Sequence, residues 1–183
     1  MHYPSNEPVT FSRNCDAVII PSGDEVKLSE GVSGFLTQAL GGSFSIYVEG
    51  NLFRIAGADA DAIGKEPIVP PEIPINATTQ QIEAVVWEQL KTCYDPEIPI
   101  NVVDLGLIYS CELQTTETNE YLANVEMTLT APGCGMGDIL MQDVKEKIEI
   151  IPTIREAKVE LVFDPPWNQS MMSETAQLEA GLL

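Results

Sequence analysis

A short proline-rich segment near the middle of the chain limits what this sequence can fold into. Residues 66–74 read Glu-Pro-Ile-Val-Pro-Pro-Glu-Ile-Pro, with four prolines in eight positions. Proline fixes φ and removes a backbone N–H donor, so neither a helix nor a central strand can run through this stretch. The pattern predicts an extended, semi-rigid linker over residues 66–77, between two separately folded units.

Residues 1–65 predict a small antiparallel β domain. Turn residues recur every seven to ten positions, which is typical of short strands joined by tight turns. The strand candidates are Ala17–Ile20, Glu25–Leu28, Phe44–Val48 and Leu52–Ile55. The last two are expected to form a hairpin around Gly50, with one face turned inward. We expect a barrel or sandwich of the SH3-like size class, with Cys15 just before the first of these strands.

Residues 78–183 predict a compact α/β domain, which makes the whole chain α+β. Thr78 and Gln81 have the spacing of a capping box at a helix start. The expected order is α-β-β-α-β-α. The segments are a helix from 78 to about 93, strands at 107–113 and 121–130, a helix at 138–150, a strand at 159–163 and a short helix at 173–178.

The charge of the chain excludes several classes of partner. It has 9 Lys+Arg and 28 Asp+Glu, a net charge of −19. Residues 1–65 contribute 4 − 8 = −4 and the remainder 5 − 20 = −15. Binding to nucleic acid or to anionic lipid depends on basic residues, so neither is expected. No run approaches the roughly 20 apolar residues of a membrane span, and no signal peptide is recognisable, so a cytoplasmic location is expected.

The cysteines and the single histidine exclude several kinds of site. No Cys-x-x-Cys pair occurs among the four cysteines, which are Cys15, Cys93, Cys111 and Cys134. This spacing argues against a zinc ribbon or a thioredoxin-like motif. His2 is the only histidine, so catalysis by a Ser-His-Asp or Cys-His pair is not expected. Cys93 and Cys111 fall on the apolar faces of their predicted helix and strand, and we interpret both as core residues.

Cys134 stands apart because it lies among glycines, between a predicted strand and a predicted helix. Gly133, Gly135 and Gly137 let the backbone approach a bulky ligand closely. The amino end of a helix favours anions, so a thiolate is stabilised there and can act as a nucleophile or a metal ligand. The alternative is an ordinary loop cysteine on a glycine-rich turn.

Three carboxylates, Asp95, Glu97 and Asp104, cluster in the segment that precedes the first strand of this domain. Aspartates before Pro or before Leu-Gly commonly bond to the backbone of a turn, which is a purely structural role. The alternative is an oxygen-rich metal site, or an acid/base pair beside the thiol.

Two long motifs carry a resemblance to a known family. They are Asp-Pro-Glu-Ile-Pro-Ile-Asn-Val-Val-Asp-Leu-Gly-Leu-Ile-Tyr at 95–109 and Thr-Leu-Thr-Ala-Pro-Gly-Cys at 128–134, with Pro-Pro-Trp at 165–167 and Met-Ser-Glu at 172–174. Together they resemble the PaaD/SufT-like family of iron–sulfur cluster assembly factors. Segments 37–43, 50–52 and 59–65 resemble the SufT-like branch, whose members are encoded with the SUF cluster-building machinery.

The resemblance implies a maturation factor that helps to deliver iron–sulfur clusters to apo-proteins, and no enzymatic reaction. It implies that Cys134 handles cluster or iron and is the candidate metal ligand, with Thr130, Asp95, Glu97 and Asp104 in the same region. The implied partners are SUF proteins and apo iron–sulfur clients. The implied fold is a compact α/β domain, which agrees with the order expected from the residues.

The residues themselves constrain how such a factor works. A cluster usually needs four thiolates, and one chain offers one well-placed thiol, so we expect a transient cluster or iron and none held stably by one protomer. An adaptor, a transient carrier and a cluster shared in a homodimer remain open. The alternative functions are an assembly subunit for a multicomponent oxygenase and a thiol-dependent enzyme using Cys134.

Overall fold

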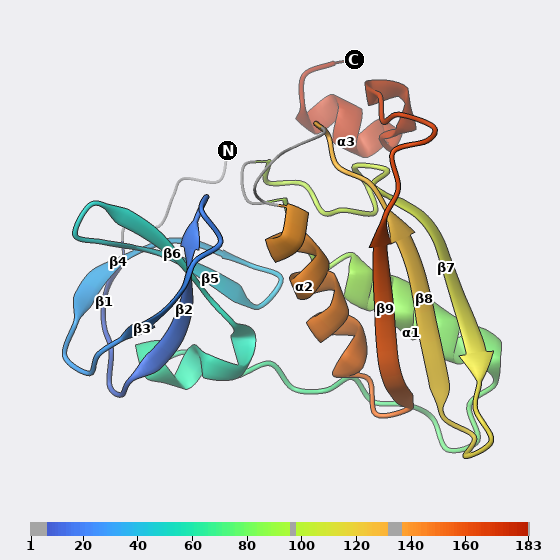
Figure 1. Ribbon diagram of the computed structural model, residues 1–183, viewed down its shortest axis with the longest axis horizontal. Coiled ribbons are helices and arrows are strands. Elements are labelled where there is room, and N and C mark those ends of the chain that lie inside the picture. Colours follow the sequence, from blue (N-terminus) through green and yellow to red (C-terminus); the bar gives the residue numbers. More distant parts are fainter. Residues whose placement is uncertain (1–6, 96–97, 132–136, 183) are drawn as a thin grey trace. The chain divides into compact units, whose positions relative to one another are not determined.

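The chain divides into two compact units within the proline-rich segment. The computed structural model describes residues 7–95, 98–131 and 137–182. Unit 1 comprises residues 1–69 and unit 2 residues 70–183 (Figure 1). No helix within the described ranges is long and apolar enough to cross a membrane.

Unit 1 is built on one six-stranded antiparallel sheet, in the order β1-β4-β5-β6-β2-β3. Its elements are β1 (Glu7–Thr10), β2 (Cys15–Ile20), β3 (Glu25–Leu28), β4 (Ser33–Leu40), β5 (Ser43–Val48), β6 (Asn51–Ile55) and the 3-10 helix η1 (Gly57–Ile63). The all-β prediction is confirmed, although the sequence pattern missed β1 and β4. The SH3-like size class stays a prediction.

Alternation along the strands of unit 1 separates its core from its surface. In β5, Phe44, Ile46 and Val48 are buried, while Tyr47 between Ile46 and Val48 is exposed. The predicted β5–β6 hairpin is confirmed: Val48 pairs with Asn51 across a two-residue loop. Both loop residues have positive φ, the geometry that matches the twist of paired strands.

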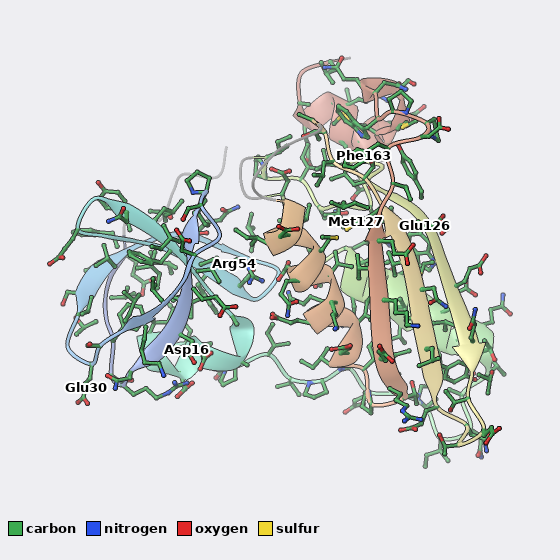
Figure 2. The ribbon with its side chains drawn as sticks, viewed as in Figure 1. Asp16, Glu30, Arg54, Glu126, Met127 and Phe163 are labelled. Atoms are coloured by element: carbon green, nitrogen blue, oxygen red, sulfur yellow. The ribbon has the colours of Figure 1, made fainter. Side chains whose placement is uncertain are left out.

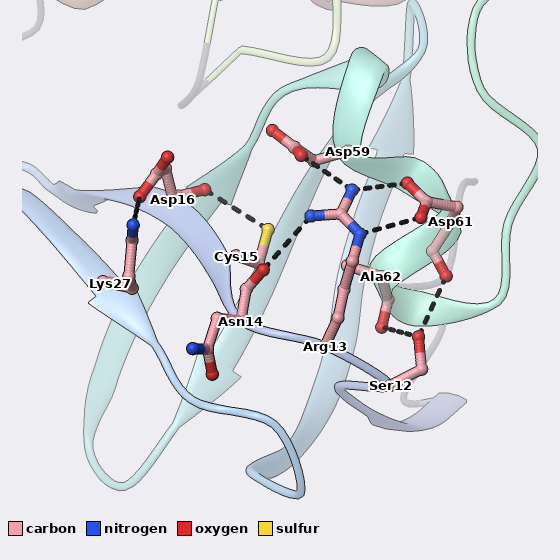
Figure 3. Close-up of polar contacts among 9 residues, drawn as sticks. All are labelled: Ser12, Arg13, Asn14, Cys15, Asp16, Lys27, Asp59, Asp61 and Ala62. Carbon is pink, nitrogen blue, oxygen red and sulfur yellow. Dashed lines mark hydrogen bonds and ion pairs between the residues drawn. The ribbon is translucent and has the colours of Figure 1, made fainter.

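Cys15 corrects one expectation about unit 1. It is the first residue of β2 rather than a residue preceding the strand, and its side chain is 1% exposed. Arg13, two residues earlier, bonds to Asp61 through two nitrogens, at 2.8 and 2.6 Å, and to Asp59 at 2.8 Å (Figure 3). These bonds join the segment before β2 to η1.

Unit 2 combines a three-stranded sheet with helices, in the order β7-β8-β9. Its elements are α1 (Thr79–Leu90), β7 (Ile108–Thr115), β8 (Tyr121–Met127), α2 (Gly137–Glu149), β9 (Ile154–Leu161), the 3-10 helix η2 (Gln169–Met171) and α3 (Glu174–Glu179). β8 is antiparallel to β7 and parallel to β9, which it reaches through α2. The predicted α-β-β-α-β-α order and the α+β class are confirmed.

Helices α1 and α2 form one core with the apolar face of this sheet. The capping box predicted at Thr78 and Gln81 is present at the start of α1. Ile82, Val86 and Leu90 are buried on one face of that helix. The opposite face of the sheet carries polar side chains: Met127 at the end of β8 is fully buried, whereas its neighbour Glu126 is exposed (Figure 2).

Several element boundaries in unit 2 differ from expectation. β8 ends at Met127 and not at Thr130. β9 begins at Ile154, five residues before its predicted start, because residues there pair with β8 despite their weak apolar pattern. It ends at Leu161, so Phe163 lies beyond the strand and is 45% exposed. The last helix begins one residue after its cap, Ser173.

The segment at 66–77 contains no helix or strand. Its apolar side chains anchor it to the unit on each side. Ile68 lies against Gly57 and donates its N–H to the Gly57 carbonyl at 3.3 Å. Ile73 and Ala77 pack against the core of unit 2. The proline spacing prevents regular structure here, while the apolar residues between the prolines still make contacts.

Candidate functional site

The loop between α1 and β7 contains both described members of the predicted carboxylate group. The carboxylate of Asp95 accepts a hydrogen bond from the Ile98 N–H at 3.1 Å. Asn101 donates from its side-chain amide to Asp104 Oδ2 at 2.6 Å. Asn101 Oδ1 in turn accepts from the N–H groups of Val103 and Asp104, at 3.1 and 2.9 Å. Asp95 therefore closes a turn by bonding to the backbone, as the structural interpretation expected. In the second turn Asn101 bonds to the backbone, and the Asp104 carboxylate bonds to the Asn101 side chain instead.

The C-terminal segment holds this loop in place through its backbone. Trp167 donates its indole N–H to the Leu105 carbonyl at 2.8 Å. The Ser173 N–H donates to the Asp104 carbonyl at the same distance. Because these bonds engage backbone oxygens of the loop, the Asp104 carboxylate keeps its bond to the Asn101 side chain. The motif at 95–109 and the tail motifs at 165–167 and 172–174 are thus parts of one structure, joined by contacts between residues 62 and 69 positions apart.

Gly106 is required where the tail crosses the loop. Its φ is +70°, and a Cβ atom there would meet the carbonyl oxygen of Met171 at 2.2 Å. No side chain fits without moving that backbone. Tyr109, at the start of β7, adds a bond from its hydroxyl to the Pro165 carbonyl at 2.7 Å. Gly106 and Tyr109 belong to the motif at 95–109, but nothing in the sequence alone indicates these contacts.

The end of β8 leads into the predicted cluster-handling motif. The Thr128 N–H donates to the Leu107 carbonyl at 2.8 Å, which ties this end of β8 to the Asp104 loop. The Thr128 side chain is fully buried, and its hydroxyl has no hydrogen-bond partner within the described ranges. Thr130 is half-buried in the segment that follows. Thr128 is a residue that sequence reasoning missed, since a buried hydroxyl has no signature in one sequence.

The structure describes three of the five predicted site residues. Asp95, Asp104 and Thr130 lie in loops at the ends of α1, β7 and β8. Glu97 and Cys134 lie outside the described residues. Across the described part of the chain, no three His, Cys, Asp or Glu side chains group so as to hold a metal ion. The role of all five residues stays a prediction.

The other three cysteines lie in hydrophobic cores. Cys15 is 1% exposed in unit 1, and Cys93 and Cys111 are 0% and 9% exposed in unit 2. Burial raises the pKa of Cys15 and of Cys111 to about 11, which keeps both as neutral thiols near pH 7. The interpretation of Cys93 and Cys111 as core residues is confirmed.

Known proteins resemble the part of the chain that carries this site. The family described as "Iron-sulfur cluster assembly protein" matches residues 83–161. An "Fe-S protein maturation auxiliary factor" of Porphyromonas gingivalis (strain ATCC BAA-308 / W83) is 45% identical over 103 residues, which are 56% of this chain and 94% of that protein.

Two further relatives have names of the same kind. The "Fe-S protein maturation auxiliary factor SufT" of Staphylococcus aureus (strain USA300) is 39% identical over 48% of this chain and 96% of its own length. The "Fe-S protein maturation auxiliary factor YitW" of Bacillus subtilis (strain 168) is 31% identical over 51% of this chain and 87% of its own length.

The extent of these matches separates the two units. The relatives are matched over most of their own length by about half of this chain, so they leave little room for a further unit. The family match lies wholly within unit 2. The resemblance of segments in unit 1 to the family therefore stays a prediction. On the evidence of its second unit, the chain belongs to the SufT-like family of iron–sulfur cluster assembly proteins.

Proposed function

We propose that this protein assists the maturation of iron–sulfur proteins as an adaptor or transient carrier, with Cys134 as the residue that contacts the iron or cluster being transferred. The relatives support the general role, because all three are named as maturation auxiliary factors. Those names describe no enzymatic reaction, and we propose none.

Burial of the other cysteines is the observation that carries the finer proposal. Cys15, Cys93 and Cys111 are all buried, so three of the four thiols are held within apolar cores. Iron–sulfur clusters are usually held by four thiolates, and a buried neutral thiol cannot become a ligand without opening the core. One chain thus offers Cys134 alone, which favours transfer of a cluster over permanent storage.

Carboxylates of the neighbouring motif complete the proposal. Asp95 shapes the loop through its bond to the backbone and Asp104 through its bond to the Asn101 side chain. Glu97 and Thr130 are proposed to flank the same cargo. The proposed partners are SUF cluster-assembly proteins and apo iron–sulfur clients in a reducing cytoplasm. The net charge of −19 supports this choice, because it attracts cations and basic surfaces and repels nucleic acid.

A pair of cysteine variants tests the proposal. Cys134→Ser should fold with a loss of about 1 kcal/mol or less, as for other loop substitutions, yet fail to support client maturation in a strain lacking the wild-type gene. Cys111→Ser is the matched control. It buries a hydroxyl at a cost of roughly 1–3 kcal/mol if no partner is found, but the folded protein should remain active.

Client enzyme activity and the thermal midpoint of each purified variant are the two measurements. Full complementation by Cys134→Ser would contradict the proposal. Absorbance of anaerobically purified protein distinguishes the two proposed roles. Visible charge-transfer bands with acid-labile sulfide indicate a carrier, and colourless protein that promotes maturation indicates an adaptor. Turnover of a small thioester or disulfide would instead indicate a thiol enzyme.

A further inference from the structure

Strand β9 forms an open edge of the sheet in unit 2. Among the described strands, β8 alone pairs with it. The Val162 N–H donates to the Met127 carbonyl of β8 at 2.8 Å, whereas the Ala157 N–H faces away from β8 and donates to Glu149 Oε1 at 3.0 Å. Backbone groups alternate along a strand. Val159 and Leu161 therefore also point their N–H and C=O groups outward, where the described residues provide no partner.

The same alternation places two opposite charges beside this edge. Lys158 and Glu160 are exposed on the polar face of the sheet. Neither side chain forms an ion pair or hydrogen bond within the described ranges. Charged side chains on an edge strand usually discourage pairing with another chain. Here, however, Lys158 and Glu160 flank Val159 symmetrically with opposite signs, so two antiparallel copies can attract each other.

We propose that two copies of this protein associate through β9, paired antiparallel about a two-fold axis at Val159. The outward groups of Val159 then bond to those of the partner's Val159, and the Leu161 N–H bonds to the Ala157 carbonyl of the other copy. Lys158 lies opposite Glu160 of the other copy at both non-hydrogen-bonded positions, where side chains are closest. The two three-stranded sheets become one sheet of six strands.

Charge and hydrogen bonding select this register over its neighbours. A two-fold axis at Lys158 would oppose two lysines, and an axis at Glu160 would oppose two glutamates, which is destabilising. An axis at Ala157 would again pair opposite charges, but its central bonds need the Ala157 N–H. That N–H is already bonded to Glu149. The register at Val159 keeps this bond and still forms four others.

Other edges of the molecule lack this combination. β7, the opposite edge of the same sheet, has Glu112 as its one charged residue, so self-pairing there offers no attraction. β3 in unit 1 contains Glu25 and Lys27, but it has four residues and Lys27 already pairs with Asp16 at 3.2 Å. Beside β9, in contrast, a groove of about 410 Å³ runs along α2 and gives room for an incoming strand.

A charge-reversal cycle in the full-length protein tests the proposal. Sedimentation equilibrium at about 0.15 M salt measures the dimer dissociation constant. Lys158→Glu and Glu160→Lys should each raise this constant roughly tenfold or more, because each replaces two attractive pairs by two repulsive ones. The double variant restores both pairs in reversed order and should return the constant to near its wild-type value.

The single variants also exclude a general effect of net charge. Lys158→Glu makes the chain more negative and Glu160→Lys makes it less negative, so non-specific repulsion would move the two constants in opposite directions. Glu156→Lys is the matched control on the same strand and face. In the proposed register it lies opposite Val162 of the other copy, and it should change the constant less than about threefold, within the context-dependence of a single exposed charge.

Amide exchange of the wild-type protein locates the interface directly. Protection of the Val159 and Leu161 amides should rise with protein concentration, while that of Lys158 and Glu160, which bond to β8, should not change. A monomer at all accessible concentrations would overturn the proposal. So would a dimer dissociation constant that neither charge reversal changes, or a double variant that dimerises as weakly as the single variants. Thermal midpoints of all variants verify that they remain folded.

Discussion

The two units of this chain are stabilised in different ways. In unit 1, ion pairs join residues far apart in the sequence: Arg13 with Asp61, and Lys65 with Glu7 at 2.8 Å. In unit 2, the ion pairs Lys91 with Glu88 and Lys145 with Glu149 join residues only three or four positions apart. Long-range order there comes from backbone hydrogen bonds between the C-terminal segment and the Asp104 loop.

This difference indicates which changes each unit tolerates. Ion pairs at a surface depend on pH and salt, so unit 1 is sensitive to conditions that leave its core unchanged. The tail of unit 2 is held by backbone groups and by the close approach at Gly106, so its sensitivity is steric. The family match covers unit 2 alone. The close contact between Gly106 and the tail therefore belongs to the unit that carries the proposed function.

The largest expected effect tests whether the units unfold independently. Ile46→Ala removes a fully buried side chain from unit 1 and should lower its free energy of unfolding by about 2–5 kcal/mol. Leu90→Ala should do the same to unit 2. Both tryptophans, Trp87 and Trp167, lie in unit 2, so their fluorescence reports on that unit. The fluorescence transition should shift in urea for Leu90→Ala only; a shift in both would mean coupled units.

A smaller effect compares two glycines with positive φ. Gly31→Ala in unit 1 meets nothing within 4 Å and should cost about 1–2 kcal/mol for the left-handed backbone alone. Gly106→Ala has the same strain and also displaces the Met171 backbone, so its cost should exceed that of Gly31→Ala. Tryptophan fluorescence in urea measures the cost of Gly106→Ala in unit 2, and circular dichroism in urea measures that of Gly31→Ala in unit 1. Equal costs would show that the tail moves aside freely.

The smallest effect is the acid sensitivity of unit 1. The hydrogen bond from Arg13 holds the pKa of Asp61 below its ordinary value. A lowered pKa in the folded state stabilises the unit above the unfolded pKa, about 3.9, and this contribution disappears as pH falls through the folded value. Arg13→Met should therefore be less stable than wild type at neutral pH, with a difference that shrinks in acid. Circular dichroism in urea follows it, and a difference independent of pH would contradict it.

Local patterns in the sequence predicted much of the fold. The capping box at Thr78, the apolar face of α1 and the β5–β6 hairpin follow from residues close together in the chain, and all three are confirmed. β4 was missed because Gly34 and a bulge between Leu36 and Gln38 interrupt its alternation. The predicted start of β9 is five residues too late, because the first half of this strand pairs with β8 through its backbone and its side chains show no clear alternation.

The candidate site likewise combines local turns, which the sequence indicates, with long-range contacts, which it does not. The sequence predicted that Asp95 bonds to the backbone of its turn, since a short aspartate side chain reaches only groups nearby, and this is confirmed. It did not predict that Asn101 accepts the backbone bonds in the turn before Asp104 and donates to the Asp104 carboxylate. It could not show that Trp167 and Ser173 hold the same loop, because those contacts join residues more than 60 positions apart. Glu97 and Cys134 lie outside the described residues, so their part in the site rests on the motif and on the proposed experiments.

By itself, the sequence determined the two units, the linker between them, the α-β-β-α-β-α order and the acidic charge, because each depends on composition or on periodicity along the chain. Only the tertiary structure decided that three of the four cysteines are buried and that the tail crosses the loop at Gly106. It also decided which backbone groups of β9 remain open. Burial and pairing depend on what the rest of the chain places nearby, and that information is not local.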